Sequence, residues 1–114
     1  MRMTKIITAA AISLLALSSA AYAAGDAKKG KVAFEKNGCW QCHGYQGQGG
    51  VAGPVLQRTQ LPYEALNNFV RETSGAMPPF SKKILSDGDL EDIYAYLQSI
   101  PAPADPKTIK LLNP

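Results

Sequence analysis

Residues 39–43 of this chain of 114 residues read Cys-Trp-Gln-Cys-His. Two thiols three positions apart, with an imidazole directly after the second, are what covalent haem attachment requires. Cys39 and Cys42 can each form a thioether with one porphyrin vinyl group, and His43 then faces the iron. This five-residue motif is far more specific for haem attachment than Cys-x-x-Cys alone. It predicts one covalently bound haem c, with His43 as an iron ligand.

Three other uses of the two cysteines compete with haem attachment. A tetrahedral zinc site needs four ligands, but the sequence holds only two cysteines and one histidine. A thioredoxin-like dithiol would follow a β-strand, and no strand-like run precedes Cys39. A disulfide within the motif would close a very small loop and stabilise little. Covalent haem is the favoured interpretation, and a redox dithiol is the main alternative.

The first 23 residues have the pattern of a signal peptide. Arg2 and Lys5 form a basic start, residues 6–17 an apolar run, and residues 21–23 a small-x-small cleavage site. The apolar run is too short to span a bilayer. A retained N-terminal anchor is the alternative. We expect a periplasmic protein that is left without a membrane anchor after cleavage.

Cleavage would change the charge balance. The full sequence has 12 basic and 9 acidic residues, a formal net charge of +3. Loss of Arg2 and Lys5 leaves a mature chain near +1, without a long basic cluster. Nothing in this balance favours binding to nucleic acid.

A helix is predicted before the motif, over residues 25–36. Asp26 is its expected N-cap or first-turn acid, and Asn37-Gly38 end it. Gly30 and Phe34 share one face of this helix. A glycine inside a helix is unfavourable, which suggests that another helix comes close at Gly30.

Two further helices are predicted after the motif. The first covers residues 61–72, with Pro62 at its first position. The last covers residues 86–100, with Ser86 as its cap and Pro101 as its stop. Their expected buried faces are Leu66, Phe69 and Val70 in the former, and Leu90, Ile93, Tyr94 and Leu97 in the latter, with Tyr96 at the edge of that stripe.

Two irregular segments connect these helices. Residues 44–60 are rich in glycine and show neither helical nor strand periodicity. The edge of a haem would be a suitable core for such a loop to wrap. Residues 73–81 contain Met77, the only methionine after the signal peptide. A lone methionine is ordinarily a core gap-filler. Here the chain from His43 to Met77 is long enough to reach the opposite face of a porphyrin, so Met77 is the predicted second axial ligand.

The expected division of the chain is a signal peptide (1–23), a haem domain (24–100) and a proline-rich tail (101–114). The tail is expected to be extended and to lie over the surface. It ends in the apolar residues Ile109, Leu111 and Leu112.

Over residues 25–100 the chain resembles the class I cytochromes c, and closely the small bacterial periplasmic ones. The resemblance rests on Gly30 and Phe34, the haem motif, Gly53-Pro54 with Leu56, the loop 77–80 and the run 93–97. It implies an all-α cytochrome c fold, in which three to four short helices and loops wrap one haem. It also implies that the first and last helices cross at right angles, pairing Gly30 and Phe34 with Ile93 and Tyr96.

The same resemblance implies a role for Pro54, whose carbonyl would accept the second N–H of His43 and fix the tautomer of the ring. Two features depart from the family. Trp40 lies inside the haem motif, whereas mitochondrial members use a tryptophan in the central loop to hold a propionate. The propionate partners are therefore open, with Arg71, Arg58 and Tyr63 as candidates. The tail is not part of the common core and is a candidate docking feature.

If His43 and Met77 both bind the iron, no position remains for a substrate, and only an electron can pass. We therefore expect a one-electron carrier between exported redox proteins rather than an enzyme. Transient docking is expected near Cys42 and Lys82-Lys83, with a periplasmic dehydrogenase or a membrane cytochrome complex as possible partners.

Two alternatives to a free carrier stay open. The chain could be a cytochrome subunit held by a periplasmic dehydrogenase. It could also be a haem enzyme or sensor with an open iron site, although peroxidase chemistry would want a distal histidine and none follows His43.

Overall fold

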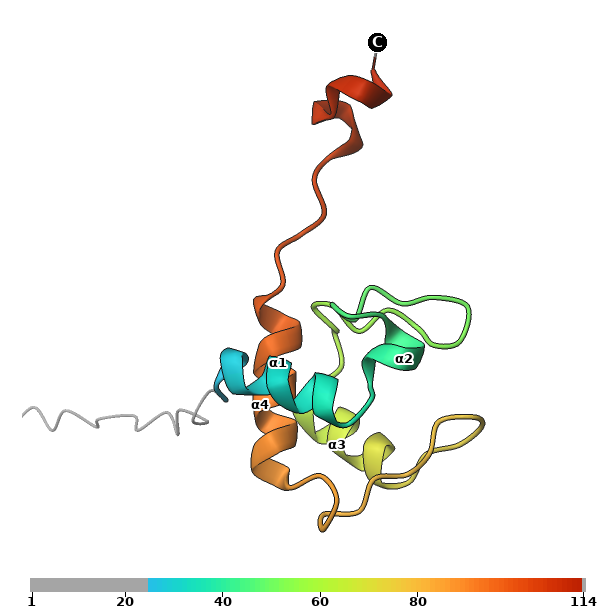
Figure 1. Ribbon diagram of the computed structural model, residues 1–114, viewed down its shortest axis with the longest axis vertical. Coiled ribbons are helices and arrows are strands. Elements are labelled where there is room, and N and C mark those ends of the chain that lie inside the picture. The colour runs from blue at the N-terminus through green and yellow to red at the C-terminus, as the bar shows by residue number, and fades with distance from the viewer. Residues whose placement is uncertain (1–24, 114) are drawn as a thin grey trace, which may run out of the picture.

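The computed structural model describes residues 25–113, so the predicted signal peptide and its cleavage site lie outside the described residues. Helices and loops make up this part of the chain, and it contains no strand (Figure 1). The predicted all-α class is confirmed. The elements are α1 (Ala27–Lys36), α2 (Trp40–His43), α3 (Tyr63–Arg71), α4 (Asp87–Ser99) and two 3₁₀ turns, η1 (Pro106–Thr108) and η2 (Lys110–Leu112).

Helix α1 begins at the predicted cap. The Asp26 carboxylate accepts hydrogen bonds from the backbone N–H groups of Lys28 (2.9 Å) and Lys29 (3.1 Å). The bond from Lys29, together with that from Lys28, lowers the pKa of Asp26. The backbone N–H of Asp26 in turn donates to Oδ1 of Asp92 in α4, at 2.6 Å. The start of α1 is therefore tied directly to α4.

The central contact of the fold is the crossing of α1 over α4 (Figure 1). Gly30 is buried there, and a Cβ atom at this position would overlap the backbone carbonyl of Asp92. Only glycine lets the two backbones come this close. One turn later, the fully buried Phe34 packs edge-to-face on Tyr96, with ring centroids 5.7 Å apart. The predicted pairing of the two helices is confirmed.

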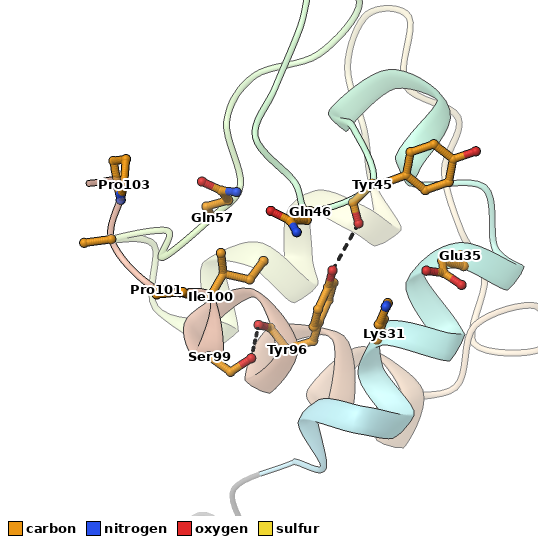
Figure 2. A pocket seen from close by; sticks show the side chains of 11 residues that line it. Lys31, Glu35, Tyr45, Gln46, Gln57, Tyr96, Ser99, Ile100, Pro101 and Pro103 are labelled. Atoms are coloured by element: carbon orange, nitrogen blue, oxygen red, sulfur yellow. Dashed lines mark hydrogen bonds between the residues drawn. The ribbon is translucent and has the colours of Figure 1, made fainter. Parts of the chain in front are cut away.

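Tyr96 also fixes the loop that follows α2. Its hydroxyl donates a hydrogen bond of 3.0 Å to the carbonyl oxygen of Tyr45 (Figure 2). A second bond joins the same two parts of the chain, from the backbone N–H of Arg58 to the carbonyl oxygen of Leu97, at 2.8 Å. Both ends of the glycine-rich segment 44–60 are thus anchored to α4.

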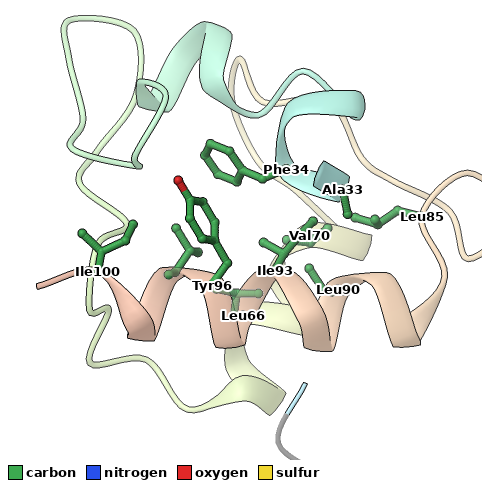
Figure 3. Close-up of a cluster of buried hydrophobic side chains, with 10 residues drawn as sticks. Ala33, Phe34, Leu66, Val70, Leu85, Leu90, Ile93, Tyr96 and Ile100 are labelled. Carbon is green, nitrogen blue, oxygen red and sulfur yellow. The ribbon is translucent and has the colours of Figure 1, made fainter. Parts of the chain in front are cut away.

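Buried side chains from α1, α3 and α4, together with Leu85 before α4 and Ile100 after it, form one core (Figure 3). Tyr96 belongs to it, whereas Tyr94 is only half-buried and donates a hydrogen bond to the Leu61 carbonyl at 2.9 Å. The expectation that Tyr94 lies in the buried stripe and Tyr96 only at its edge was wrong, because α1 covers the side of α4 that carries Tyr96. The core residues are Ala33, Phe34, Leu66, Val70, Leu85, Leu90, Ile93, Tyr96, Leu97 and Ile100.

Helix α3 is shorter than predicted. Pro62 is its N-cap, with extended backbone angles, and the first helical residue is Tyr63. Leu66 and Val70 are buried as expected. Phe69 is not, since 46% of its surface is exposed among the described residues. Helix α4 begins after Ser86, whose hydroxyl accepts from the Asp89 N–H at 3.1 Å as predicted.

The tail does not lie over the helices. After Pro101 the chain runs outward from α4 and ends in the two 3₁₀ turns (Figure 1). The expectation that it covers the surface was wrong. Within residues 25–113, none of the helices has the length and apolar character that crossing a membrane demands.

Candidate haem site

His43 is buried at the end of α2 and is oriented by one hydrogen bond. Its Nδ1 atom lies 2.8 Å from the carbonyl oxygen of Pro54. A carbonyl can only accept, so Nδ1 carries the proton and Nε2 keeps its lone pair. This contact is the one that the family resemblance implied for Pro54. It leaves Nε2 as the nitrogen of His43 that can bind a metal.

The loop after α2 is shaped to bring Pro54 to this position. The backbone N–H of Gly49 donates to the His43 carbonyl at 2.7 Å, and that of Gly50 donates to the Gly53 carbonyl at 3.0 Å. A Cβ atom at Gly53 would lie only 2.9 Å from both the Cys42 carbonyl oxygen and His43 Nδ1. Glycine is therefore required beside Pro54 for the loop to approach the imidazole.

The two cysteines are free thiols on one helical turn. Cys39 precedes α2 in a helical conformation, so its side chain and that of Cys42 share a face. Cys39 is partly covered by the core and Cys42 is exposed. Burial raises the pKa of the Cys39 thiol to about 11. Because dithiol redox catalysis uses a thiolate of lowered pKa, this environment argues against the dithiol alternative.

Met77 lies half-buried in the loop between α3 and α4 and packs against the core. In Figure 1 this loop and α2 extend on the same side of the α1–α4 crossing. Gly75, with φ of 84°, turns the chain before it. The loop is pinned again three residues after Met77, where the Phe80 N–H donates to the Val70 carbonyl at 2.9 Å.

Arg71 is the second anchor of the Met77 loop. Its Nη1 donates to the carbonyl oxygens of Phe80 (3.0 Å) and Leu85 (2.7 Å), and its Nη2 to Oδ1 of Asp87 (2.9 Å). Its Nε donates to Asn67 at 3.1 Å, and the side chain is only 14% exposed. Arg71 was a candidate propionate partner. In the structure its guanidinium instead hydrogen-bonds to α3, the Met77 loop and the start of α4.

The other two propionate candidates differ from each other. The Tyr63 hydroxyl donates to the Asp87 carbonyl at 3.3 Å, and burial, with nearby carboxylates, raises the pKa of Tyr63 to about 12. Arg58 is exposed, and its guanidinium makes no hydrogen bond within residues 25–113. Its backbone has a positive φ of 49°, which is unusual for a non-glycine residue. Arg58 is thus the candidate whose charge is unengaged.

One aromatic contact at the motif was missed by sequence reasoning. Trp40 stacks on Tyr45, with ring centroids 4.5 Å apart and planes 9° apart. No periodic pattern predicts this pair, because the turn at Gly44, with φ of 80°, reverses the chain between them. In the sequence, Gly44 was the feature that could have indicated this turn. The stack braces α2 against the loop that carries Pro54.

The residues present fit a covalently attached porphyrin. Two unpaired thiols share one face beside an imidazole nitrogen that is free to bind a metal. The loop around them leaves apolar surface uncovered, since Val51 and Val55 are exposed. No cluster of three His, Cys, Asp or Glu side chains that could hold a metal ion by itself occurs within residues 25–113.

Comparison with known proteins shows the family of this chain. Residues 25–97 match the family described as cytochrome c oxidase, cbb3-type, subunit III. The chain is also 34% identical, over 101 residues, to the 4-cresol dehydrogenase (hydroxylating) cytochrome c subunit of Pseudomonas putida. That alignment covers 87% of this chain and 86% of the relative. No solved structure matches at a comparable level of significance. The chain belongs to the c-type cytochromes, which carry covalently bound haem c and transfer electrons rather than act as enzymes.

Proposed function

We propose that this protein is a monohaem electron carrier that takes single electrons from an exported dehydrogenase and passes them to another redox protein. Cys39 and Cys42 would hold the haem through thioether bonds, with His43 and Met77 as axial ligands. When bound, the haem supplies a one-electron couple at its iron. The observation that carries the proposal is the hydrogen bond between His43 and Pro54.

That hydrogen bond supports His43 as the ligand on one side. Because the Pro54 carbonyl holds the proton on Nδ1, the ring presents Nε2 in one tautomer and one orientation. The same bond makes the imidazole more basic, and so a better donor to a metal. The close approach of Gly53 leaves little space beside the imidazole for another orientation.

The anchored loop supports Met77 as the ligand on the other side. A thioether is a soft ligand that favours the less charged ferrous state and raises the reduction potential. Arg71 and Val70 fix the chain at Phe80, so the loop has little freedom to withdraw Met77. Ligands on both sides would leave no vacant position for a substrate, which favours electron transfer over chemistry at the metal.

The relative from Pseudomonas putida supports a dehydrogenase as the electron donor, because its name describes a cytochrome subunit of one. A subunit held by such an enzyme fits at least as well as a freely diffusing carrier. Of the two lysines expected at the docking surface, Lys82 pairs with Asp87 at 2.8 Å and Lys83 is exposed. The acceptor would be a further redox protein, such as a membrane cytochrome complex.

We also propose that the protein works in the periplasm after removal of residues 1–23. The small-x-small site at residues 21–23 supports cleavage there. Covalent haem attachment is expected in the same compartment. The intact mass of the purified protein tests both points, since it should equal that of residues 24–114 with one haem.

The proposed function is tested by reduction from a substrate. The tagged protein is purified from the periplasm of its native host together with any bound dehydrogenase, oxidised, and mixed with candidate dehydrogenase substrates under anaerobic conditions. We expect the visible spectrum to change to that of the reduced cytochrome with one electron per haem. The purified cytochrome alone, mixed with the same substrate, is the control and should stay oxidised.

The result also separates the two forms of the proposal. A stoichiometric complex that survives gel filtration would show a subunit of a dehydrogenase. If the dehydrogenase instead elutes apart from the cytochrome on gel filtration, and its fraction still reduces the cytochrome when the two are mixed with substrate, the protein is a diffusing carrier. Failure of every periplasmic fraction to reduce the protein would contradict both.

A further inference from the structure

Residues 101–105 form an extended arm that leaves the helical body at the end of α4 (Figure 1). Pro101 and Pro103 lie in the arm and Pro106 follows it, and each proline biases the residue before it towards an extended conformation. At about 3.1 Å per residue, five such residues reach about 15 Å. The arm lies beyond residues 25–97, which match the family, so the common fold does not require it.

The arm ends in a tip, residues 106–113, that is ordered by its own hydrogen bonds. The Asp105 carboxylate caps the first turn by accepting from the Lys107 N–H at 2.9 Å, and the Asp105 carbonyl accepts from the Thr108 hydroxyl at 2.7 Å. The Asn113 amide closes the second turn on the carbonyls of Pro106 (2.8 Å) and Ile109 (3.1 Å). The tip is therefore shaped without support from the helices.

The tip exposes apolar side chains that nothing in the described chain covers. Leu111 is 93% exposed and Leu112 is 62% exposed, while every leucine of the core is buried. Lys107 and Lys110 lie beside them and are exposed. Among residues 101–113 the one side-chain carboxylate, on Asp105, is occupied in capping the turn. The tip is thus an apolar surface with positive charge at its edge.

We propose that this tip is the segment by which the protein is held on its dehydrogenase, seated in an apolar groove bordered by carboxylates. This inference rests on the proposed function and names how the donor is recognised. Leu111 and Leu112 would fill the groove, and Lys107 and Lys110 would meet the carboxylates. The arm would then keep the haem domain at high effective concentration while leaving it free to orient for electron transfer.

The described features favour a dehydrogenase over a second copy of this chain. A hollow of about 700 Å³, which another tip could enter, lies between the base of the arm, α1 and the loop 44–60 (Figure 2). It is lined by both Lys31 and Glu35, so it offers no net negative charge to the lysines of a tip. The relative from Pseudomonas putida, by contrast, is named as the cytochrome c subunit of a dehydrogenase.

A membrane surface is also disfavoured. Two leucines and two lysines are a weaker signal than a single acyl chain, which by itself gives only marginal and reversible membrane binding. A groove on a protein can bury the same leucines completely. Each buried leucine is then worth about tenfold or more in affinity.

The test is steady-state reduction of the holo-cytochrome by the dehydrogenase that reduces the wild-type protein. In the variant Leu111→Ala/Leu112→Ala, we expect the KM for the cytochrome to rise about a hundredfold, since each leucine contributes about tenfold, with a smaller change in kcat. The haem spectrum and unfolding midpoint should match wild type, because the tip makes no hydrogen bond to the body. Val32→Ala is the matched control: it shortens an exposed apolar side chain on α1 and should leave KM unchanged.

A second variant tests the charges. Lys107→Glu/Lys110→Glu should raise KM more at low than at high ionic strength, whereas Lys28→Glu on α1 should not. An unchanged KM in both tip variants overturns the proposal. So does a leucine variant that loses only self-association or vesicle binding. If the dehydrogenase fails to reduce even the wild-type protein, the proposed function is contradicted, which is a separate outcome.

Discussion

The Nδ1 atom of His43 lies 2.8 Å from the carbonyl oxygen of Pro54, and Gly53 is the residue that lets the two approach. A Cβ atom at Gly53 would press on both the Cys42 carbonyl and the imidazole. The imidazole, the second cysteine and the loop therefore share one tightly packed contact. A change there should affect the stability of the fold and the properties of His43, the proposed iron ligand, together.

We predict that Gly53→Ala lowers the free energy of unfolding by about 1–3 kcal/mol, as overpacking does. It should also raise the reduction potential, because a weaker bond to Pro54 makes His43 a less basic ligand. Denaturant unfolding and a redox titration measure the two effects. Gly50→Ala is the control, since a Cβ there would find only the Cys42 carbonyl oxygen at 4.0 Å. Equal effects of the two substitutions would contradict this view of the loop.

Gly30→Ala should be more damaging. Inside a helix, alanine is more favourable than glycine by about 1 kcal/mol. The new Cβ would, however, overlap the Asp92 carbonyl and force α1 away from α4. We expect a net loss of about 3 kcal/mol in the free energy of unfolding, at the upper end of overpacking costs. Gly88→Ala, in the first turn of α4, has only the Ser86 hydroxyl at 4.0 Å and should stabilise the protein instead. A stabilised Gly30→Ala would show that the helices do not touch at this point.

Asp87 should make the stability pH-dependent in acid. Hydrogen bonds from Lys82 and then Arg71 lower the pKa of this carboxyl below 3.8. Since the folded pKa is lower than the unfolded one, the stabilisation is present above the unfolded pKa and is lost as pH falls through the folded pKa. Asp87→Asn should therefore be less stable than wild type at pH 7. The two proteins should converge in acid unfolding measurements below the ordinary carboxyl range.

Asp89→Asn serves as the control for Asp87, because Asp89 lies in the same first turn of α4 but makes no ion pair among residues 25–113. It shares the favourable interaction with the helix dipole. A difference between wild type and Asp87→Asn that stays constant down to low pH would contradict the role given to the ion pairs.

Arg71 should determine how firmly the Met77 loop is held. Arg71→Lys keeps the charge but cannot reach four acceptors at once. We expect the methionine-sulfur charge-transfer band of the ferric protein to disappear at a lower denaturant concentration than the loss of helix by circular dichroism. In wild type the two transitions should coincide. Arg58→Lys, at an exposed side chain without hydrogen bonds in the described part, should behave like wild type.

Much of the fold follows from local signals in the sequence. Asp26 and Ser86 cap the helices they were expected to cap, and the costly Gly30 correctly indicated a close helix crossing. The choice between Tyr94 and Tyr96 could not be made in this way. Both extend the stripe of α4 at helical spacing, and only the position of α1 decides which of them is covered.

The sequence indicated the residues of the haem motif but not the side chain that holds the Met77 loop. The motif and the chemistry of haem attachment indicated Cys39, Cys42 and His43. The attachment role of the two cysteines and the ligand roles of His43 and Met77 stay predictions. The role of Arg71 could not be read from the sequence, because its main acceptors are backbone carbonyls, which any residue carries. The direction of the tail was also unpredictable, since its exposed leucines resemble those of a segment that packs on its own domain.

The most direct test of the central claim, that His43 and Met77 occupy both sides of the iron, is titration of the reduced protein with carbon monoxide. We predict that the visible spectrum of the wild-type protein is unchanged by the gas. Met77→Ala should keep its covalent haem and bind carbon monoxide, because the described chain holds no second methionine to replace the lost ligand. Avid binding of carbon monoxide by the wild-type protein would contradict the account.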